Sequence, residues 1–439
     1  MNKLEKYTSY RDSGIHTSIQ VPEHWNIKRF KHLFSFGKGL NITKENLEDT
    51  GIECVNYGEI HSKFGFEINP DIHELKCVNE SYLKKDSKSL LNIGDFIFAD
   101  TSEDIEGSGN FTHLTGNKTI FAGYHTMICR PKKTLNSKYY AYLFDSKSFR
   151  SQLHKKVKGV KVYSITQNIL KDTCVWIPED NEQTKIASFL DEKTAQIDKA
   201  ISQKEKLIEL LKERRQITIN EAVTKGLDKA VEFKNSGVEW IGEIPKHWEV
   251  EKGKRLFKQM KRPVREQDEI VTCFRDGEVT LRSNRRTDGF TNALKEHGYQ
   301  GIRKGDFVIH NMDAFAGAIG ISDSDGKSTP VYSVCRPWDE NIVSSEYYAR
   351  YLRNLALQDF ILSLAKGIRE RSTDFRFKDF GELEYPLPPK DEQIKIVEYI
   401  ENQTAKIDKA IELQQNYIAK LKEYKASLID SVVTGKVRV

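Results

Sequence analysis

Residues 177–201 read IPEDNEQTKIASFLDEKTAQIDKAI, and residues 387–411 read LPPKDEQIKIVEYIENQTAKIDKAI. The offset between the two stretches is 210 residues without a gap, and 12 of the 25 positions are identical. An internal repeat of this quality indicates two copies of one structural unit. Each stretch begins next to proline and then continues without it, which predicts two long helices.

A mainly apolar seam with alternating spacings of four and three residues runs through both stretches, as in a coiled coil. In the first copy the seam comprises Leu190, Thr194, Ile197, Ile201, Lys204, Ile208 and Leu211. In the second copy it comprises Ile400, Thr404, Ile407, Ile411, Gln414, Ile418 and Leu421. Each seam alone could pack on its own domain. Two matched seams in one chain favour packing of the helices on each other.

The predicted helices have recognisable ends. Asn181 and Asp391 occupy equivalent positions and are the candidate N-caps. Gly226 and Gly435 are the candidate residues that end the helices. Each helix would then contain about 43 residues and be about 65 Å long.

Composition places the chain among soluble proteins. Of its 439 residues 30% are charged, and the mean hydropathy is −0.59. We find no long apolar stretch and no signal-peptide pattern, so we expect a cytoplasmic protein. The six cysteines are widely spaced without a CxxC motif, and we expect them to be reduced. A net charge of +5 permits an anionic partner without requiring one.

The repeat continues outside the helices. The matching motifs are VPEHW (21–25) and IPKHW (244–248), IGDFI (93–97) and KGDFV (304–308), CRP (129–131 and 335–337), YYA (139–141 and 347–349), and KGV (158–160) and KGI (366–368). Their offsets range from 206 to 223 residues, so insertions and deletions lie between them. Short β-type runs among turn residues, interrupted by helical stretches, predict an α+β fold for each globular region.

The order of these parts predicts the architecture. Globular regions 1–176 and 227–386 are each followed by a long helix, at 177–226 and 387–439. If the helices pair, the second must return antiparallel to the first and bring the C-terminus back to the first globular region. We therefore expect an antiparallel coiled coil with pseudo-two-fold symmetry, acting as a spacer between two recognition domains.

Together these motifs resemble the specificity subunit of type I restriction–modification enzymes. The resemblance rests on the IPxHW element, the GD[FI] element, the PxxxEQxxI start of each long helix and the central SGVEWIGEIPKHWEV (236–250), and it covers essentially the whole chain. It implies that each globular region is a target-recognition domain for half of a bipartite, asymmetric double-stranded DNA site. It also implies that two methyltransferase (modification) subunits and a motor-nuclease (restriction) subunit bind to the chain.

The same resemblance implies a non-catalytic subunit that directs DNA methylation and restriction. S-adenosylmethionine, ATP and Mg²⁺ would belong to the partner subunits, and this chain would hold no cofactor or metal. The sequence agrees, because it contains no GxxxxGK[ST] loop, no HExxH motif and no Asn-Pro-Pro-aromatic tetrad. Asp71, Glu74 and Lys76 imitate a nuclease site, but surface charge explains them better. We attribute the repeated His24 and His247 to structural packing.

Two basic segments precede the helices at equivalent positions and are our first candidates for DNA contacts. A basic turn in the second globular region is a further candidate. The full candidate set is Lys155, Lys156, Lys158, Lys161, Tyr163, Arg282, Arg285, Arg286, Lys366, Arg369, Arg371 and Arg376. Lysines suit phosphates, whereas arginine can also bind guanine through two hydrogen bonds. The alternative is that these segments are solvated loops.

Loops 100–110 and 310–315 carry polar side chains that can contact base edges, whereas the Gly-Asp-Phe elements suit a turn and core packing. Residues 35–92 and 258–303 do not align, so the two interiors differ within one framework. Divergent interiors predict two different half-sites. One competing hypothesis is a coiled-coil scaffold that binds no DNA. Another, which fits the motifs less well, is a nuclease or methyltransferase. Salt-dependent DNA binding would distinguish the specificity subunit from the scaffold.

Overall fold

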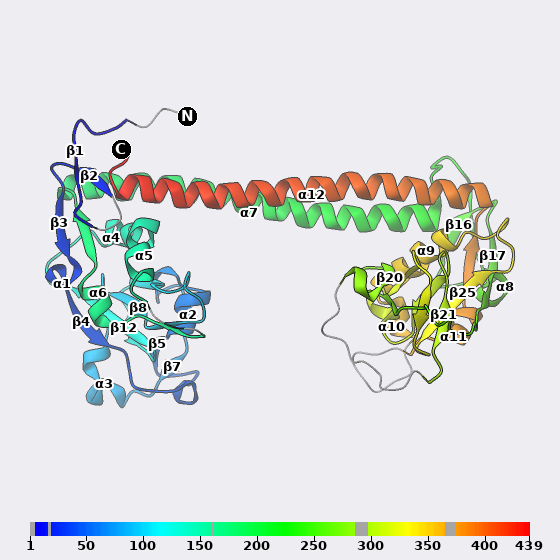
Figure 1. Ribbon diagram of the computed structural model, residues 1–439, viewed down its shortest axis with the longest axis horizontal. Helices are drawn as coiled ribbons and strands as arrows, with labels where there is room; N and C mark the ends of the chain where they lie inside the picture. Colours follow the sequence, from blue (N-terminus) through cyan, green and yellow to red (C-terminus); the bar gives the residue numbers. More distant parts are fainter. Residues whose placement is uncertain (1–4, 16–18, 158, 160, 286–296, 365–373) are drawn as a thin grey trace. The chain divides into compact units, whose positions relative to one another are not determined.

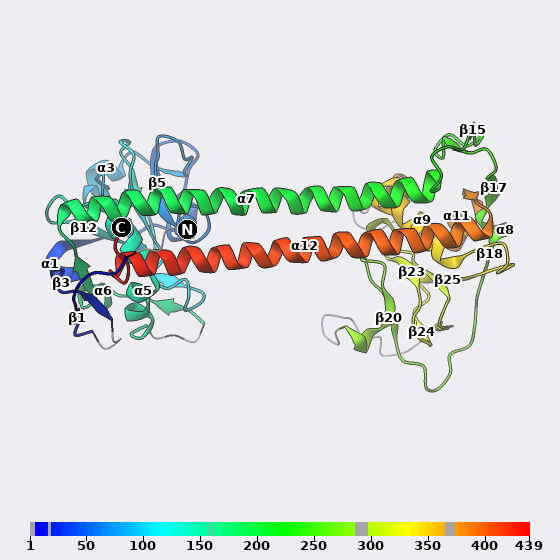
Figure 2. The ribbon, with the colours of Figure 1, turned by 90° about the horizontal axis from the view of Figure 1, so that it is seen from above.

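A computed structural model describes residues 5–15, 19–157, 159, 161–285, 297–364 and 374–439. The chain divides into two compact units, unit 1 with Met1–Lys204 and Asn416–Val439, and unit 2 with Glu205–Gln415. The predicted long helices are present as α7 (Asp180–Lys225) and α12 (Lys390–Val433), as Figures 1 and 2 show. Each long helix is continuous and contributes residues to both units.

Unit 1 combines short strands with short helices. Its strands are β1 (Tyr10–Asp12), β2 (Gln20–Pro22), β3 (Asn26–Arg29), β4 (Phe34–Lys38), β5 (Ile52–Val55), β6 (Phe66–Ile68), β7 (Cys77–Val78), β8 (Phe96–Ala99), β9 (Thr101–Ser102), β10 (Phe111–Leu114), β11 (Phe121–Ala122), β12 (Thr126–Pro131), β13 (Tyr163–Ser164) and β14 (Cys174–Ile177). Its helices, apart from the long ones, are α1 (Phe30–Leu33), α2 (Tyr57–Ser62), α3 (Tyr82–Lys85), α4 (Ser137–Asp145), α5 (Lys147–His154) and α6 (Gln167–Lys171), with 3₁₀ turns at Lys44–Asn46 and Ser87–Ser89.

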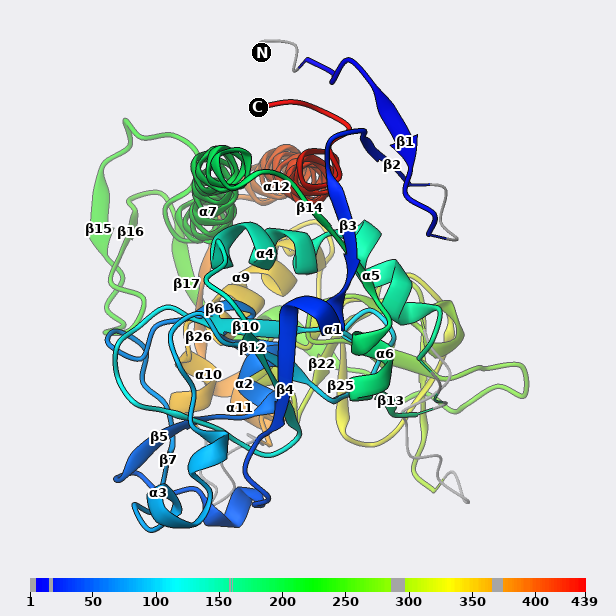
Figure 3. The ribbon, with the colours of Figure 1, turned by 90° about the vertical axis from the view of Figure 1, so that its left-hand side faces the viewer.

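The main sheet of unit 1 has the order β4-β12-β8-β10-β6, in which only the β10–β6 pair is parallel. Strand β8 is buried along its whole length, as expected for a central strand of a core. Helix α4 lies between the long helices and this sheet (Figure 3). Its Tyr142 hydroxyl donates to Asp191 of α7 at 2.7 Å. The sheet, α4 and the long helices therefore form successive layers in unit 1.

Unit 2 repeats the scheme with fewer strands. Its strands are β15 (Phe233–Asn235), β16 (Glu243–Pro245), β17 (Glu249–Lys252), β18 (Phe257–Gln259), β19 (Val271–Cys273), β20 (Val279–Leu281), β21 (Gln300–Ile302), β22 (Phe307–His310), β23 (Ile319–Ile321), β24 (Gly326–Ser328), β25 (Tyr332–Pro337) and β26 (Glu384–Leu387). Its short helices are α8 (Gly253–Leu256), α9 (Ser345–Leu357), α10 (Phe360–Ser363) and α11 (Phe377–Glu382), with 3₁₀ turns at Arg282–Asn284 and Ala314–Ala316.

The main sheet of unit 2, β18-β25-β22-β23, is antiparallel and corresponds to β4-β12-β8-β10 of unit 1. In both units a strand just before the long helix pairs with the strand that follows the His-Trp motif, as β14 with β3 and β26 with β17. The predicted α+β fold with two related units is confirmed. No helix in the described ranges is both long and apolar enough to cross a membrane.

The long helices pack antiparallel within each unit. In unit 1, Lys425 donates to Asp198 at 2.7 Å, and the Lys204 ammonium lies 4.6 Å from the centre of the Tyr417 ring. In unit 2, Arg215 lies 3.2 Å from Asp408. Partner numbers fall along α12 as they rise along α7, so the predicted antiparallel pairing is confirmed.

The seam positions are buried or half-buried. The fully buried members are Leu190, Thr194, Ile197, Ile201, Ile208, Ile400, Thr404 and Ile407, and the half-buried members are Lys204, Leu211, Ile411, Gln414, Ile418 and Leu421. Thr194 also lies 3.1 Å from the Tyr142 hydroxyl of α4. The first turns of α7 therefore pack on the globular region of unit 1 as well as on α12. The seam thus serves both kinds of packing, at different turns.

The helices begin earlier than predicted. Helix α7 starts at Asp180 and α12 at Lys390, so Asn181 and Asp391 lie inside the first turn and are not N-caps. The chain turns helical directly after its prolines, because the buried side chain of Gln183 donates to the Pro178 carbonyl at 2.9 Å and that of Gln393 donates to the Pro388 carbonyl at 2.8 Å. Each glutamine side chain forms a hydrogen bond with a backbone carbonyl just before the helix. Sequence patterns for N-caps do not include this contact.

The predicted helix ends are confirmed. Gly226 and Gly435 follow α7 and α12 with φ of +73° and +69°, a conformation that favours glycine. A side chain at Gly435 would overlap Pro22, and one at Gly226 would overlap Glu392. The glycines therefore also allow close packing against the segment that carries the His-Trp motif.

The repeated His-Trp pair anchors the first turn of a long helix. In unit 1, Glu182 accepts from the indole Nε1 of Trp25 at 3.0 Å and lies 3.1 Å from His24 Nε2. In unit 2, Glu392 accepts from Trp248 at 3.0 Å and lies 2.8 Å from His247. Both tryptophans are completely buried. This agrees with the structural role expected for these histidines.

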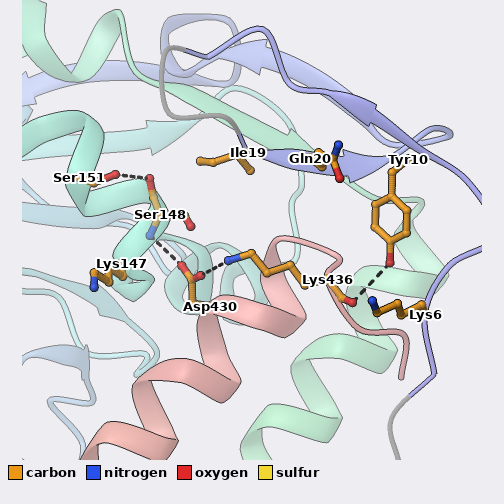
Figure 4. Close-up of a pocket in the computed structure, with 9 residues that line it drawn as sticks. All are labelled: Lys6, Tyr10, Ile19, Gln20, Lys147, Ser148, Ser151, Asp430 and Lys436. Atoms are coloured by element: carbon orange, nitrogen blue, oxygen red, sulfur yellow. Dashed lines mark hydrogen bonds and ion pairs between the residues drawn. The ribbon is translucent and has the colours of Figure 1, made fainter.

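The C-terminus returns to the first globular region, as predicted. The Arg438 amide donates to the Glu5 carbonyl at 2.8 Å. Asp430, near the end of α12, accepts from the Ser148 amide of α5 at 2.7 Å and pairs with Lys436 at 2.8 Å (Figure 4). A groove of about 950 Å³ borders this contact, between the β1–β2 hairpin, α5 and the end of α12.

The Gly-Asp-Phe and Cys-Arg-Pro motifs meet in an ion pair with a buried carboxylate in each unit. The Asp95 carboxylate accepts from Arg130 at 2.7 Å, and the Asp306 carboxylate accepts from Arg336 at 2.6 Å. Asp306 also pairs with Arg262. The hydrogen bond to Asp306 raises the pKa of Arg336. The expectation that the Gly-Asp-Phe elements form a turn and pack in the core is confirmed, because Gly94 and Gly305 have φ of +84° and +83° and Phe96 and Phe307 are buried. This pairing occurs in both units and joins the residue before the central strand to the neighbouring strand.

We predict that Asp306→Ala lowers the free energy of unfolding by about 3–5 kcal/mol, because two arginines lose a fully buried partner. Glu340→Ala is the matched control, since Glu340 pairs with the same Arg336 but is 72% exposed, and its loss is worth about 0–1 kcal/mol. Urea unfolding followed by tryptophan fluorescence measures both. Equal losses for the two variants would contradict a structural role for the buried pair.

Candidate nucleic-acid interface

Three segments meet at the end of strand β8 in unit 1. The Asp100 amide donates to the His125 carbonyl at 3.0 Å, and the Ile165 amide donates to the Asp100 carbonyl at 2.9 Å. Strand β13, at the end of the first basic segment, pairs with β9 just after Asp100. The backbone of Asp100 therefore ties the turn before β12 to the end of the basic segment. We call this arrangement the junction.

Unit 2 contains the same junction. The Asn311 amide donates to the Val331 carbonyl at 2.9 Å, and the Phe375 amide donates to the Asn311 carbonyl at 2.9 Å. The offsets from the unit 1 residues, 211, 206 and 210, equal those of the nearby repeated motifs and helices. Asp100 and Asn311 are therefore equivalent positions, as are His125 and Val331. The backbone of the junction is shared, whereas its side chains differ.

A groove of about 970 Å³ opens at the junction of unit 1. Its walls come from the end of β4, the Asp100 loop, the turn before β12 and the start of α6. The polar side chains among its lining residues are Lys38, Asn41, Asp100, Thr101, Tyr124, His125, Thr126, Ser164, Thr166, Gln167 and Asn168. Amide, hydroxyl and imidazole groups of this kind can form hydrogen bonds with base edges, and a lysine can contact phosphate.

Loop 100–110 is held by side-chain contacts. Arg150 of α5 donates to Asn110 Oδ1 at 2.8 Å, and the Asn110 amide nitrogen lies 2.9 Å from His61 Nδ1. His61 Nε2 lies 2.8 Å from the Thr101 carbonyl, and His154 Nε2 lies 2.9 Å from the Ser108 carbonyl. A preorganised loop loses less conformational entropy when it binds a ligand.

The first basic segment leaves its charges exposed. Lys155, Lys156 and Lys161 are exposed, and Tyr163 is half-buried in β13. Lys156 donates to the Asp172 carbonyl at 3.3 Å. Within the described part of the chain, no carboxylate lies within ion-pair distance of Lys155 or Lys161. These two lysines can therefore meet phosphates without first breaking an ion pair.

The candidate arginines of unit 2 differ from these lysines. Those that the structure describes, in the basic turn and in the second basic segment, already have partners. Arg285 pairs with Asp276 at 2.7 Å and Glu278 at 3.1 Å and lies 4.1 Å above the Phe274 ring. Arg282 donates to Thr272 at 3.3 Å. Arg376 pairs with Asp374 at 2.9 Å, and this hydrogen bond raises the pKa of Arg376. Lys158, Arg286, Lys366, Arg369 and Arg371 lie outside the described residues.

The nuclease-like set is not assembled. Asp71 accepts from the Asn117 amide at 2.9 Å, whereas Lys76 pairs with Asp49. Across the ranges that the structure describes, no group of three or more His, Cys, Asp and Glu side chains could hold a metal ion. The described cysteines are all free, and burial raises the pKa of the Cys129 thiol. The interpretation of the Asp71 set as surface charge agrees with this geometry.

Our motif search missed Lys38, Asn41, His125, Gln167 and Asn168, which line the groove in unit 1. The repeated motifs could have located these segments. Asp100 follows the Gly-Asp-Phe motif, His125 precedes the Cys-Arg-Pro strand, and Gln167 follows the basic segment. Charge patterns alone emphasised the lysines and arginines.

Comparisons with known proteins agree with this architecture. Residues 22–210 match the family described as "Type I restriction modification DNA specificity domain". The Type I restriction enzyme MjaVIII specificity subunit of Methanocaldococcus jannaschii is 24% identical over 438 residues, covering 96% of this chain and 95% of the relative.

Two solved structures have a similar fold. The HsdS subunit from Thermoanaerobacter tengcongensis matches with a TM-score of 0.56 at 17% identity, over 97% of this chain and 100% of the other. A chain from a structural study of complex assembly and conformational transition of the type I R-M system matches with a TM-score of 0.67 at 16% identity, over 94% and 98%. Specificity subunits are the non-catalytic part of their complexes and hold no cofactor. Residues 22–210 therefore belong to the type I restriction–modification DNA specificity-domain family, and over its whole length this chain is similar to type I specificity subunits, which recognise the DNA sequence in these systems.

Proposed function

We propose that the chain reads a bipartite, asymmetric site in double-stranded DNA, with the globular part of each unit recognising one half-site. The carrying observation is the junction, whose backbone hydrogen bonds are the same in both units while the side chains on it differ. Identical side chains on the same backbone would suit a palindrome. Different side chains on the same backbone suit two different half-sites.

Catalysis and its cofactors would belong to other subunits. In this proposal two modification subunits bring S-adenosylmethionine and methylate the site, and a restriction subunit brings ATP- and Mg²⁺-dependent cleavage. Helices α7 and α12 are each continuous through both units, so we also propose that their length sets the spacing between the half-sites. The domain limits 1–176, 177–226, 227–386 and 387–439 are part of this proposal.

Replacing residues 227–386 by the corresponding region of another specificity subunit is expected to change only one half of the methylated site. The reason is that each unit has its own core and its own junction. Single-molecule mapping of methylated bases, with the chimera and the modification subunits expressed together, measures the outcome. Changes in both halves would contradict recognition by independent domains.

The lysines and arginines are expected to behave differently. The double variant Lys155→Ala/Lys161→Ala should weaken binding to all DNA sequences alike and reduce the slope of log K against log salt by up to about two, roughly 0.9 for each lost phosphate contact. Arg285→Ala should leave the slope unchanged, because Asp276 and Glu278 already neutralise its charge. Binding titrations of the assembled methyltransferase at several salt concentrations test this. If Arg285→Ala changed the slope and the double lysine variant did not, Arg285 and not the two lysines would contact phosphates.

An exposed apolar patch on each unit is a candidate docking surface for a modification subunit. In unit 2, Leu210 and Ile217 of α7 lie on one face of the helix and border a groove of about 780 Å³ that Phe233 and Tyr399 also line. In unit 1, Tyr417 and Tyr424 of α12 are exposed at the same seven-residue spacing. One patch per unit fits two copies of the partner, and apolar patches on charged helices suit helix packing.

Leu210→Ala combined with Ile217→Ala is expected to weaken binding of the modification subunit to unit 2 by at least about tenfold, because central apolar contacts carry much of the energy of an interface. Ile342→Ala is the control, since Ile342 is equally exposed in the same unit but lies away from this groove. Analytical ultracentrifugation of mixtures gives the stoichiometry. Retention of two bound copies at the wild-type affinity would exclude this patch.

A further inference from the structure

The junction carries one side chain per unit that stands at the same backbone position but differs completely in chemistry. In unit 1 it is His125, and in unit 2 it is Val331. Each carbonyl accepts a hydrogen bond from the residue after the central strand, at 3.0 Å from Asp100 and 2.9 Å from Asn311. The two positions thus share this backbone hydrogen bond, although φ is positive at His125 and not at Val331.

His125 is held in one orientation. Its Nδ1 lies 3.2 Å from Asp100 Oδ1, and the rings of Tyr57 and Tyr124 pack against it edge-on, with centroids 5.3 and 5.9 Å away. Because Asp100 engages Nδ1, Nε2 is the ring nitrogen left for another partner. The side chain lines the groove of unit 1 and remains half exposed. An imidazole fixed in this way can form a directed hydrogen bond with a base edge.

The backbone of His125 also points to a role for its side chain. Its φ is +54°, a left-handed conformation that glycine adopts without strain and other residues adopt less readily. Glycine would make the same backbone hydrogen bond to Asp100. The structure therefore keeps an imidazole where the fold alone favours glycine, which is the pattern of a functional position.

Val331 presents a different surface. It is 38% exposed, and its neighbour Tyr332 packs edge-on against His310 at 4.5 Å. Burial lowers the pKa of His310, which favours a neutral imidazole beside Tyr332. An exposed, branched apolar side chain cannot form a hydrogen bond with a base. It can pack against the C5-methyl group that thymine presents in the major groove.

We propose that this junction position is a specificity-determining residue in both units: His125 contacts a polar base edge of the first half-site, and Val331 contacts a thymine methyl group of the second. The inference rests on the proposed function and deepens it, because it identifies one residue per half-site and the base chemistry that each recognises. The rest of the groove in unit 1, including Thr101, Gln167 and Asn168, supplies neighbouring contacts.

The methyl contact has a direct chemical test. The probes are duplexes of the mapped site in which each thymine of the second half-site is replaced, one at a time, by deoxyuridine, which lacks only the methyl group. With the assembled methyltransferase we expect one substitution to weaken binding about fourfold, the value of one buried methyl-sized group. In Val331→Ala the same substitution should have no effect, whereas Ile342→Ala should retain the fourfold difference.

The histidine is tested by separating stability from recognition. His125→Gly removes the imidazole while favouring the left-handed backbone, so the melting temperature should stay the same or rise. Discrimination at one base pair of the first half-site should fall about 2- to 13-fold, the usual net value of a single hydrogen bond, while the second half-site remains unchanged.

The outcomes are distinguishable. Absence of sequence-specific binding by the wild-type complex would overturn the proposed function itself. Specific binding with no deoxyuridine effect that depends on Val331, or with unchanged discrimination in His125→Gly, would overturn the junction assignment alone.

Discussion

Each unit depends on the packing of one long helix end against a globular core that lies far away in the sequence. In unit 1 the buried Trp176 indole donates to the Val433 carbonyl at the end of α12. In unit 2 the buried Tyr347 hydroxyl donates to the Val223 carbonyl near the end of α7 at 2.7 Å. Leu428, Ile429, Val432 and Val433 belong to the core of unit 1, and Ile219, Ala222 and Val223 belong to the core of unit 2. Antiparallel pairing of the helices is therefore a condition for both cores, and not a feature added to finished domains.

The shared framework and the variable surface use different interactions. Interactions of buried groups hold the framework: the buried Asp95 and Asp306 carboxylates with their arginines, the buried tryptophans bound to Glu182 and Glu392, and the backbone bonds of the junction. Half-exposed side chains form the surface around the junction, where Asp100 and His125 correspond to Asn311 and Val331. Changing a buried charge without its partner is costly, whereas changing a half-exposed side chain is not. This difference allows recognition to vary while the fold is retained.

Much of this organisation could be predicted from the repeat. The 4,3 spacing, the proline-bounded starts and the terminal glycines predicted α7, α12 and their antiparallel return, because these signals are local and periodic. The pairing of Gly-Asp-Phe with Cys-Arg-Pro was not predicted, since it joins residues 35 and 30 positions apart in the two units through side chains. Arg285 shows the same limit for the candidate site. Its charge suggested DNA contact, but only the fold reveals that Asp276 and Glu278 already surround it.

The return of the C-terminus to unit 1 has a consequence for biosynthesis. Unit 2 is a continuous segment, Glu205–Gln415, so all of its residues are translated before residues 416–439. Unit 1 begins to be translated first, yet its core lacks residues 416–439 until unit 2 has been translated. Domains generally fold in the order in which they emerge. Here the first globular region must wait until residues 416–439 follow unit 2, with the apolar surface that α12 will cover left open in the meantime.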